Sequence, residues 1–306
     1  MNADTSTRWL EAQNSSIALT AIGAADHFWS VVQRLRAAQL GLVVILPALL
    51  AIAAQFKADL TVTAGLLGFA LTIIDTVLIY PFISMERHRA AQAQDIFDSI
   101  ALDLPRSELR RSQDPDQGDM RDAAAKQNRS RAARNRDWYS RVLGKLPCTM
   151  GRIACMKEST AWDGGLRVRY VWLVVGCSVS VFLAFIAYAL FSRLDGASIV
   201  TRILFPLTPA IVWSGRELWD HFDASRAVSR LREALQRAWN DGLAGRAAET
   251  QLSALAVDFS AALFAYRSKT APVPHLIYGL LRNRQAVSMQ EAAQDLVNEH
   301  LSLSQL

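Results

Sequence analysis

The sequence has few of the residues that build catalytic or metal sites. It holds three cysteines (Cys148, Cys155 and Cys177) and five histidines, and none of them form a CxxC or Cys/His cluster with metal-ligand spacing. Its 15 glycines include no GxGxxG loop, and the patterns HExxH and GxSxG are absent. We therefore expect no enzyme, no metal and no cofactor. No stretch alternates apolar and polar residues as a strand does, so we expect a helical protein.

Charged residues are nearly missing from four long stretches, which are the most informative feature of the chain. The stretches run over 37–56, 60–83, 170–191 and 197–213. A helix needs about 20 apolar residues to cross about 30 Å of hydrocarbon, and three of the four reach or nearly reach this length. Only Lys57–Asp59 separates the first pair and Ser192–Gly196 the second. The sequence predicts an all-α integral membrane protein with four transmembrane helices in two tight hairpins.

Basic residues indicate on which side of the membrane the polar parts lie. The segment 86–169 carries 17 Lys and Arg against 12 Asp and Glu, an excess that equals the net charge of +5 of the whole chain. The two short turns carry only Lys57 and Arg193. Because basic residues are retained on the cytoplasmic side, we expect both termini and the central loop to be cytoplasmic. This bias also explains the isoelectric point near 9.3, so a nucleic acid polymer is not an expected partner.

The polar segments alternate with the hairpins along the chain. We expect an N-terminal helix (1–36), a first hairpin (37–83), a cytoplasmic loop (84–169), a second hairpin (170–213) and a helical tail (214–306). The loop and the tail would form a cytoplasmic helical bundle.

Two parts of the loop differ in pattern. Apolar residues at 93, 96, 97 and 100 share one helical face, which predicts a helix over 86–103 that continues the second span. Apolar residues almost vanish over 106–136, where Pro115 and Gly118 interrupt the chain. This composition indicates a disordered or loosely helical insert.

The tail is helical in pattern throughout. Helices are predicted near 216–240 and 248–267, and a last helix begins at Ser288, with Glu291 as the capping-box partner.

Asp75 is a carboxylate inside the second apolar stretch. A charge at mid-span costs roughly 2.5–3.5 kcal/mol on insertion scales, so such a residue usually faces water or the interior of a bundle. One interpretation is a pore-lining or gating carboxylate. The other is a protonated or hydrogen-bonded side chain partnered by Ser178, Ser180 or a backbone group, and the sequence leaves both open.

Several stretches in order around the four spans resemble the S-4TM family, the SMODS-associated four-transmembrane effectors of bacterial anti-phage systems. They are LEAQNSS (Leu10–Ser16), AQAQDIFDSIALDLP (Ala91–Pro105), the approach to the third span with Pro147, Ile153, Cys155, Trp162, Asp163, Leu166, Arg167 and Tyr170, and a tail with Phe264, Arg267, Pro274, Tyr278 and Arg282. The chain departs from the family pattern at Met156 and Ser159, where glutamine and asparagine are expected.

The resemblance implies a mechanism. A cGAS/DncV-like nucleotidyltransferase of a CBASS system would make a cyclic oligonucleotide second messenger, which the cytoplasmic part would bind. The spans would then form a homo-oligomer that disrupts or permeabilises the bacterial inner membrane, and the cell would die before phage matures, by abortive infection. Four spans are too few for a wide pore in a single chain, so several copies would be required.

Ligand-binding residues are predicted within the family-like stretches. Lys157, Arg167 and Arg267 are candidate phosphate-binding cations, and Trp162 and Tyr266 are neighbouring rings on which a base could stack. The simpler alternatives are that Arg167 flanks a span and that Trp162 packs the helix leading into it.

Two other functions fit the same architecture. One is a constitutive small ion channel or transporter, and the other is a membrane-anchored signalling scaffold without pore activity. Flux without a ligand would indicate the first, and absence of toxicity on activation would indicate the second.

Overall fold

The computed structural model describes residues 8–57, 59–127, 129–273 and 291–302. Helices make up nearly all of these residues and no strand occurs among them, which confirms the prediction of an all-α protein. Four helices are long and apolar enough to cross a membrane, as predicted: Ser16–Phe56, Leu60–Ala101, Arg167–Phe191 and Gly196–Leu243. The protein is therefore a multi-pass membrane protein.

Three of these long helices are built from α-helices joined by a π-helical turn. The first consists of α2 (Ser16–Leu40), a π-turn (Gly41–Ile45) and α3 (Leu46–Phe56). The second consists of α4 (Leu60–Ile74), a π-turn (Asp75–Ile79) and α5 (Tyr80–Ala101). The last consists of α10 (Gly196–Ile199), a π-turn (Val200–Leu204) and α11 (Phe205–Leu243). The third span is part of the single helix α9 (Cys148–Phe191).

Proline explains where the π-turns occur. Each of the three turns ends two residues before a proline: Pro47, Pro81 or Pro206. A proline ring lacks an N–H and clashes with the carbonyl four residues earlier, and a wider turn accommodates both effects. For Pro206 that carbonyl belongs to Arg202, and it accepts a hydrogen bond from Gln55 Nε2 at 3.0 Å. A neighbouring helix therefore satisfies the group that the proline leaves free.

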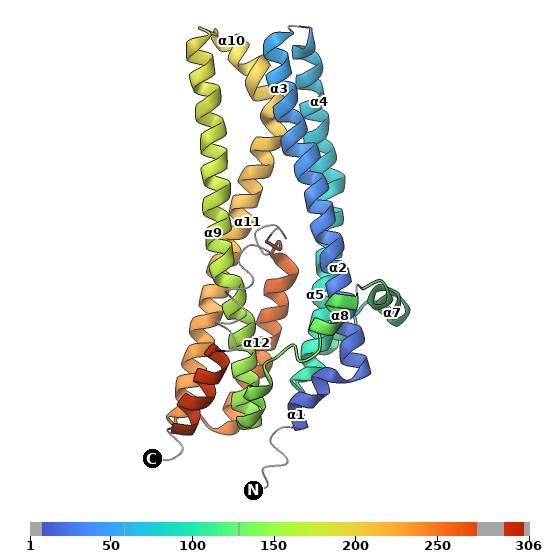
Figure 1. Cartoon of the computed structure of the whole chain (residues 1–306), viewed down its shortest axis with the longest axis vertical. Coiled ribbons are helices and arrows are strands. Elements are labelled where there is room, and N and C mark those ends of the chain that lie inside the picture. The colour runs from blue at the N-terminus through green and yellow to red at the C-terminus, as the bar shows by residue number, and fades with distance from the viewer. Residues whose placement is uncertain (1–7, 58, 128, 274–290, 303–306) are drawn as a thin grey trace. The chain divides into compact units, whose positions relative to one another are not determined.

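The chain divides into two compact units. The core unit comprises Met1–Ser30, Glu86–Leu166 and Ala224–Leu306, and the membrane unit comprises Val31–Met85 and Arg167–Asp223. In the membrane unit, α3 packs along α4, and both contact the π-turn at Val200–Leu204 (Figure 1).

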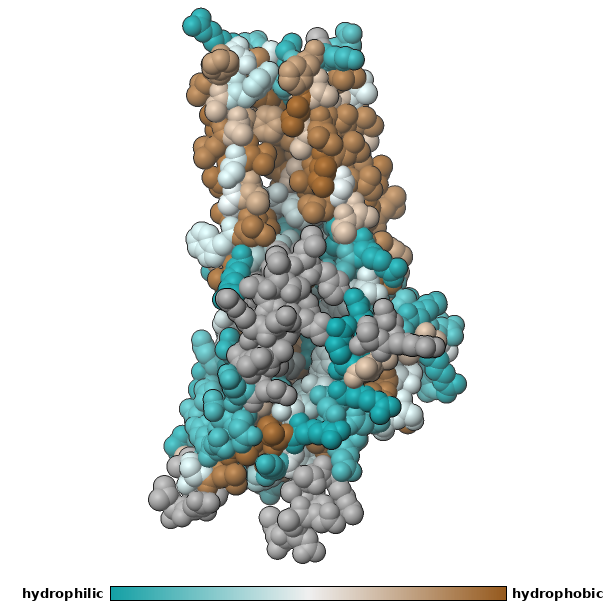
Figure 2. All heavy atoms as spheres, in the orientation of Figure 1, coloured by the Kyte–Doolittle hydropathy of each residue, from teal (hydrophilic) through white to brown (hydrophobic). Residues whose placement is uncertain are grey.

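The surface of the membrane unit is apolar. Large side chains such as Phe56, Phe69 and Phe191 are 63–90% exposed, and Figure 2 shows hydrophobic side chains gathered over this part of the chain. Such a surface favours lipid over water as the surrounding medium.

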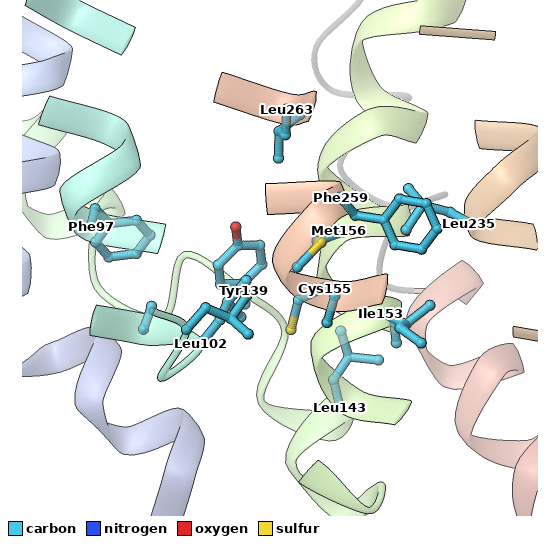
Figure 3. Close-up of a cluster of buried hydrophobic side chains, with 14 of the residues drawn as sticks. Phe97, Leu102, Tyr139, Leu143, Ile153, Cys155, Met156, Leu235, Phe259 and Leu263 are labelled. Carbon is cyan, nitrogen blue, oxygen red and sulfur yellow. The ribbon is translucent and has the colours of Figure 1, made fainter. Parts of the chain in front are cut away.

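The core unit is organised around one hydrophobic cluster. Side chains from α2, α5, α9, α11 and α12 (Glu249–Lys269) meet in it, together with those from a short 3-10 helix (Arg141–Lys145). Figure 3 shows Phe97 of α5, Tyr139, Leu143, Met156 of α9 and Phe259 of α12 in this cluster. Residues 291–302 form a further helix, which buries Ala293 and Val297.

The segment 106–136 contains three short helices: α6 (Glu108–Arg111), α7 (Gln117–Ala125) and α8 (Arg129–Arg134). Of the two predicted alternatives, a disordered or a loosely helical insert, the structure shows short helices, and ion pairs hold the start of the segment in place. Arg106 and Arg110 both pair with the buried carboxylate of Asp95 in α5, and Arg106 also pairs with Asp114. These ion pairs fix the start of the segment 106–136, which has almost no apolar side chains of its own to pack against the core. The predicted cap Ser288 and the family-like Pro274, Tyr278 and Arg282 lie outside the described residues.

Candidate functional site

Asp75 lies in the interior of the membrane unit, where its side chain is only 2% exposed. Gln39 Nε2 of α2 donates to its Oδ1 at 2.6 Å, and Arg216 of α11 forms an ion pair with its Oδ2. The Arg216 guanidinium also lies 4.1 Å from the ring centre of Tyr80, in a cation–π contact. Both carboxylate oxygens are therefore bound by side chains from other helices.

These contacts show that Asp75 is hydrogen-bonded, through partners other than those expected. Gln39 and Arg216 bind it, in place of Ser178, Ser180 or a backbone group. Asp75 is also the first residue of the π-turn that precedes Pro81. Its role as a pore-lining or gating carboxylate stays a prediction.

A second buried carboxylate, Glu217, follows Arg216 directly in α11. Arg36 of α2 forms an ion pair with it, and the Tyr170 hydroxyl of α9 donates to its Oε1 at 2.6 Å. His221, one helical turn later, places Nε2 at 3.1 Å from the same oxygen. Three helices thus contribute to the surroundings of Glu217.

The contact between His221 and Arg167 fixes the state of the imidazole. Arg167 Nη1 lies 3.2 Å from His221 Nδ1. A guanidinium can only donate, so Nδ1 must be the accepting nitrogen of a neutral ring. The proton then resides on Nε2, which donates to Glu217. His221 is 1% exposed and Arg167 is 3% exposed, so water does not replace either contact.

We call this assembly the membrane-unit network. All four long helices of the membrane unit contribute to it, and its charged members are Arg36, Asp75, Arg167, Arg216 and Glu217. Buried charges of this kind are expensive, and removal of one partner from a buried pair typically costs about 3–5 kcal/mol. Glu217 and His221 were not predicted from the sequence, although a carboxylate and an imidazole one turn apart at the end of an apolar stretch were a visible signal.

Two of the predicted ligand residues are part of the packed interior of the core unit. Arg267 forms a buried ion pair with Asp98 and donates to Ser159 Oγ at 2.7 Å. Asp98 also accepts a hydrogen bond from the Tyr139 hydroxyl at 2.7 Å. Tyr266 is 8% exposed and belongs to the hydrophobic cluster. Arg267 therefore joins α12 to α5 and α9 in this structure.

Lys157 lies on a different face of α9. Its ammonium group is 4.9 Å from the ring centre of Trp239, and burial lowers its pKa to about 8. It lines a cavity of the core unit. Ser159, which binds Arg267, is two residues further along the helix and so projects about 200° away from Lys157.

The five predicted ligand residues are therefore not gathered into one described site. In the core unit, Lys157 lies on one face of α9, and Arg267 of α12 contacts another face of α9 through Ser159. Arg167 belongs to the membrane unit. The side chain of Trp162 is not among the side chains that the structure describes. A ligand-binding role for each of these residues stays a prediction.

The fold and the membrane-unit network define a class: multi-pass α-helical membrane proteins with four spans, ion pairs among the spans and a separate helical core. The family model described as the SMODS-associating 4TM effector domain matches residues 8–296, and the chain belongs to this family. The match confirms the resemblance found in the sequence, and it links the protein to SMODS systems. No curated protein and no solved structure matches the chain.

Proposed function

We propose that the protein is an anti-phage effector that a cyclic oligonucleotide activates to permeabilise the bacterial inner membrane. A cGAS/DncV-like nucleotidyltransferase would supply the activator. The spans would be arranged as two hairpins (37–83 and 170–213), and the termini and a helical bundle would lie in the cytoplasm. Activated copies would assemble into a homo-oligomer, and the resulting loss of the permeability barrier would cause abortive infection.

The observation that carries this proposal is the membrane-unit network. Charged residues among membrane spans are rare because they are costly, and they usually mark ion pathways or gates. Here an arginine from another helix neutralises each carboxylate. The charges of the unit are therefore paired as long as its helices stay packed as a closed bundle. A rearrangement of the helices would separate the pairs and expose charged groups that favour water. The network therefore supports a membrane unit with a closed state and an activated state.

Asp75 is the proposed gating carboxylate. Its pairing with Arg216 joins the π-turn of the second span to α11 of the fourth span. Loss of this pair would leave both charges without compensation in an apolar surrounding, which would favour a hydrated, open arrangement. Lys157, Trp162, Arg167, Tyr266 and Arg267 remain the proposed ligand-binding set, although Arg267 would first have to leave Asp98.

Dye release from proteoliposomes tests the proposal. The purified full-length chain is reconstituted, and release is recorded with and without each member of a panel of cyclic di- and trinucleotides. Release with one nucleotide only is the expected result. Release without any nucleotide would favour a constitutive channel or transporter, and no release with insertion confirmed would favour a signalling scaffold.

A further inference from the structure

A cavity of about 280 Å³ opens in the core unit between three helices. Its walls come from α9, α11 and the helix 291–302. The polar lining residues are Lys157, Glu158, Thr160, Arg232, Gln236 and Asp295. The volume approaches the lower end of the range of small-molecule pockets. The remaining lining residues are apolar: Ala161, Ala292, Ala293 and Leu296.

Two cations of the cavity wall have no ion-pair partner among the described residues. Lys157 contacts the face of Trp239, and the nearby Glu299 instead accepts the indole N–H of Trp239 at 2.9 Å. Arg232 is exposed on α11, and no carboxylate lies within ion-pair distance of it in the described part of the chain. Two unpaired cations at one cavity favour an anionic ligand.

The acidic residues of the wall offset this charge only in part. Burial raises the pKa of Glu158 to about 7, although Ser140 N–H donates to its carboxyl at 3.3 Å. Glu158 is therefore about half protonated near neutral pH. Asp295 is the other acidic residue of the wall. Asp295 and Gln236 supply an acceptor and an amide that could bind hydrogen-bonding groups of a ligand other than its phosphate.

We propose that this cavity binds a small molecule that carries a phosphate group, with Lys157 and Arg232 as the cations that bind the phosphate. The assignment rests on the proposed function, because it identifies where the activating ligand would be recognised. It adds Arg232, Gln236 and the helix 291–302 to a site of which the sequence indicated only Lys157. The guanidinium of Arg232 can bind two phosphate oxygens at once, and the Lys157 ammonium acts as a point charge beside them.

Binding is measured with the full-length chain in nanodiscs by isothermal titration calorimetry, a readout that is independent of membrane permeability. The probes are inorganic phosphate and the panel of cyclic di- and trinucleotides. Binding of a cyclic nucleotide that millimolar phosphate does not displace would identify a nucleotide site. Binding of phosphate alone would identify a free-phosphate site, and both outcomes support the proposal.

The test variants are Arg232→Gln and Lys157→Met, and the matched control is Arg237→Gln. Arg237 is exposed on the same helix and does not line the cavity, so the control makes the same change of charge. Methionine keeps an apolar stem over Trp239. We expect Arg232→Gln and Lys157→Met to raise the Kd at least tenfold, and Arg237→Gln to change it less than twofold.

Equal Kd values for Arg232→Gln and Arg237→Gln would overturn the assignment, as would wild-type protein that binds none of the probes. The two proposals fail separately. Dye release that is triggered by a nucleotide and unchanged by Arg232→Gln and Lys157→Met would overturn the site and leave the proposed function standing. Ligand binding that requires Arg232 but never causes dye release would keep the site and overturn the proposed function.

Discussion

Arg216 and Asp75 form an ion pair in the interior of the membrane unit although 141 positions separate them in the chain. The pair joins the second span to the fourth. Gln39 from the first span binds the other carboxylate oxygen of Asp75. Three spans therefore depend on one acidic side chain, whose position in an apolar stretch would otherwise be unfavourable.

Removal of one member of this pair should destabilise the membrane unit more than removal of both. Arg216→Met leaves Asp75 buried without its counter-ion, and we expect a loss of about 3–5 kcal/mol. The double variant Arg216→Met/Asp75→Leu removes both charges and should recover much of this loss. Unfolding in detergent, analysed as a double-mutant cycle, measures the coupling. Additive effects would show that the pair is not coupled.

His221 should be a neutral imidazole with its proton on Nε2. The prediction follows from the Arg167 contact at Nδ1 and the Glu217 contact at Nε2. Nitrogen-15 NMR of histidine-labelled protein distinguishes the tautomers, and His221→Gln assigns the signal. A doubly protonated ring at neutral pH, or a proton on Nδ1, would contradict the arrangement.

Gly68 should tolerate no side chain, whereas Gly65 on the same helix should. A Cβ at Gly68 would lie 2.8 Å from the carbonyl oxygen of Phe205 and 2.9 Å from that of Pro206, and backbone cannot move aside cheaply. A Cβ at Gly65 would lie 3.6 Å from the Phe205 side chain, an ordinary contact. We expect Gly68→Ala to cost about 1–3 kcal/mol and Gly65→Ala to be neutral or stabilising.

The two alanine variants are compared by thermal unfolding in the same detergent. Equal melting temperatures for Gly68→Ala and Gly65→Ala would mean that α4 does not approach the backbone of α11 as closely as the structure indicates.

Glu158 should make the stability of the core unit depend on pH. Burial raises its pKa from 4.5 to about 7 in the folded chain. The folded state therefore holds this proton more tightly than the unfolded state, so the contribution is fully present below pH 4.5 and is lost as the pH rises towards 7. Glu158→Gln should flatten the unfolding free energy over this window.

Lys157 titrates in the opposite sense and at higher pH. Its pKa is lowered from 10.5 to about 8, so its contribution is present above pH 10.5 and is lost as the pH falls through 8. Because the two windows do not overlap, urea unfolding at pH 5, 7 and 9 separates them. A pH profile of Glu158→Gln that equals that of the wild type between pH 4.5 and 7 would contradict the first assignment.

Local pattern was sufficient to predict the long helices of this chain. Hydropathy and length identified the four spans, and helical periodicity identified the helix that continues the second span to Ala101, near its predicted end at residue 103. These features depend on neighbouring residues, so a single sequence contains them.

The contacts of the sites depend on distant residues, and the sequence did not reveal them. Nothing local to Arg216 indicates Asp75, because 141 positions separate the two residues. The ion pairs from Asp95 that hold the insert were missed for the same reason, since a polar segment has no apolar periodicity to indicate where it packs. The prediction that Arg267 binds a ligand depended on its charge, its family-like stretch and the neighbouring Tyr266, whereas its pairing with Asp98 is a tertiary contact.

The most direct test of the account is dye release by wild-type protein and Asp75→Asn reconstituted side by side, without nucleotide and with the activating one. Asp195→Asn is the control, because Asp195 caps α10 outside the network and asparagine preserves the cap. We predict that wild type and Asp195→Asn release dye only with nucleotide, and that Asp75→Asn releases dye without it. The contradicting result would be an Asp75→Asn variant that inserts correctly and, like Asp195→Asn, releases no dye until nucleotide is added.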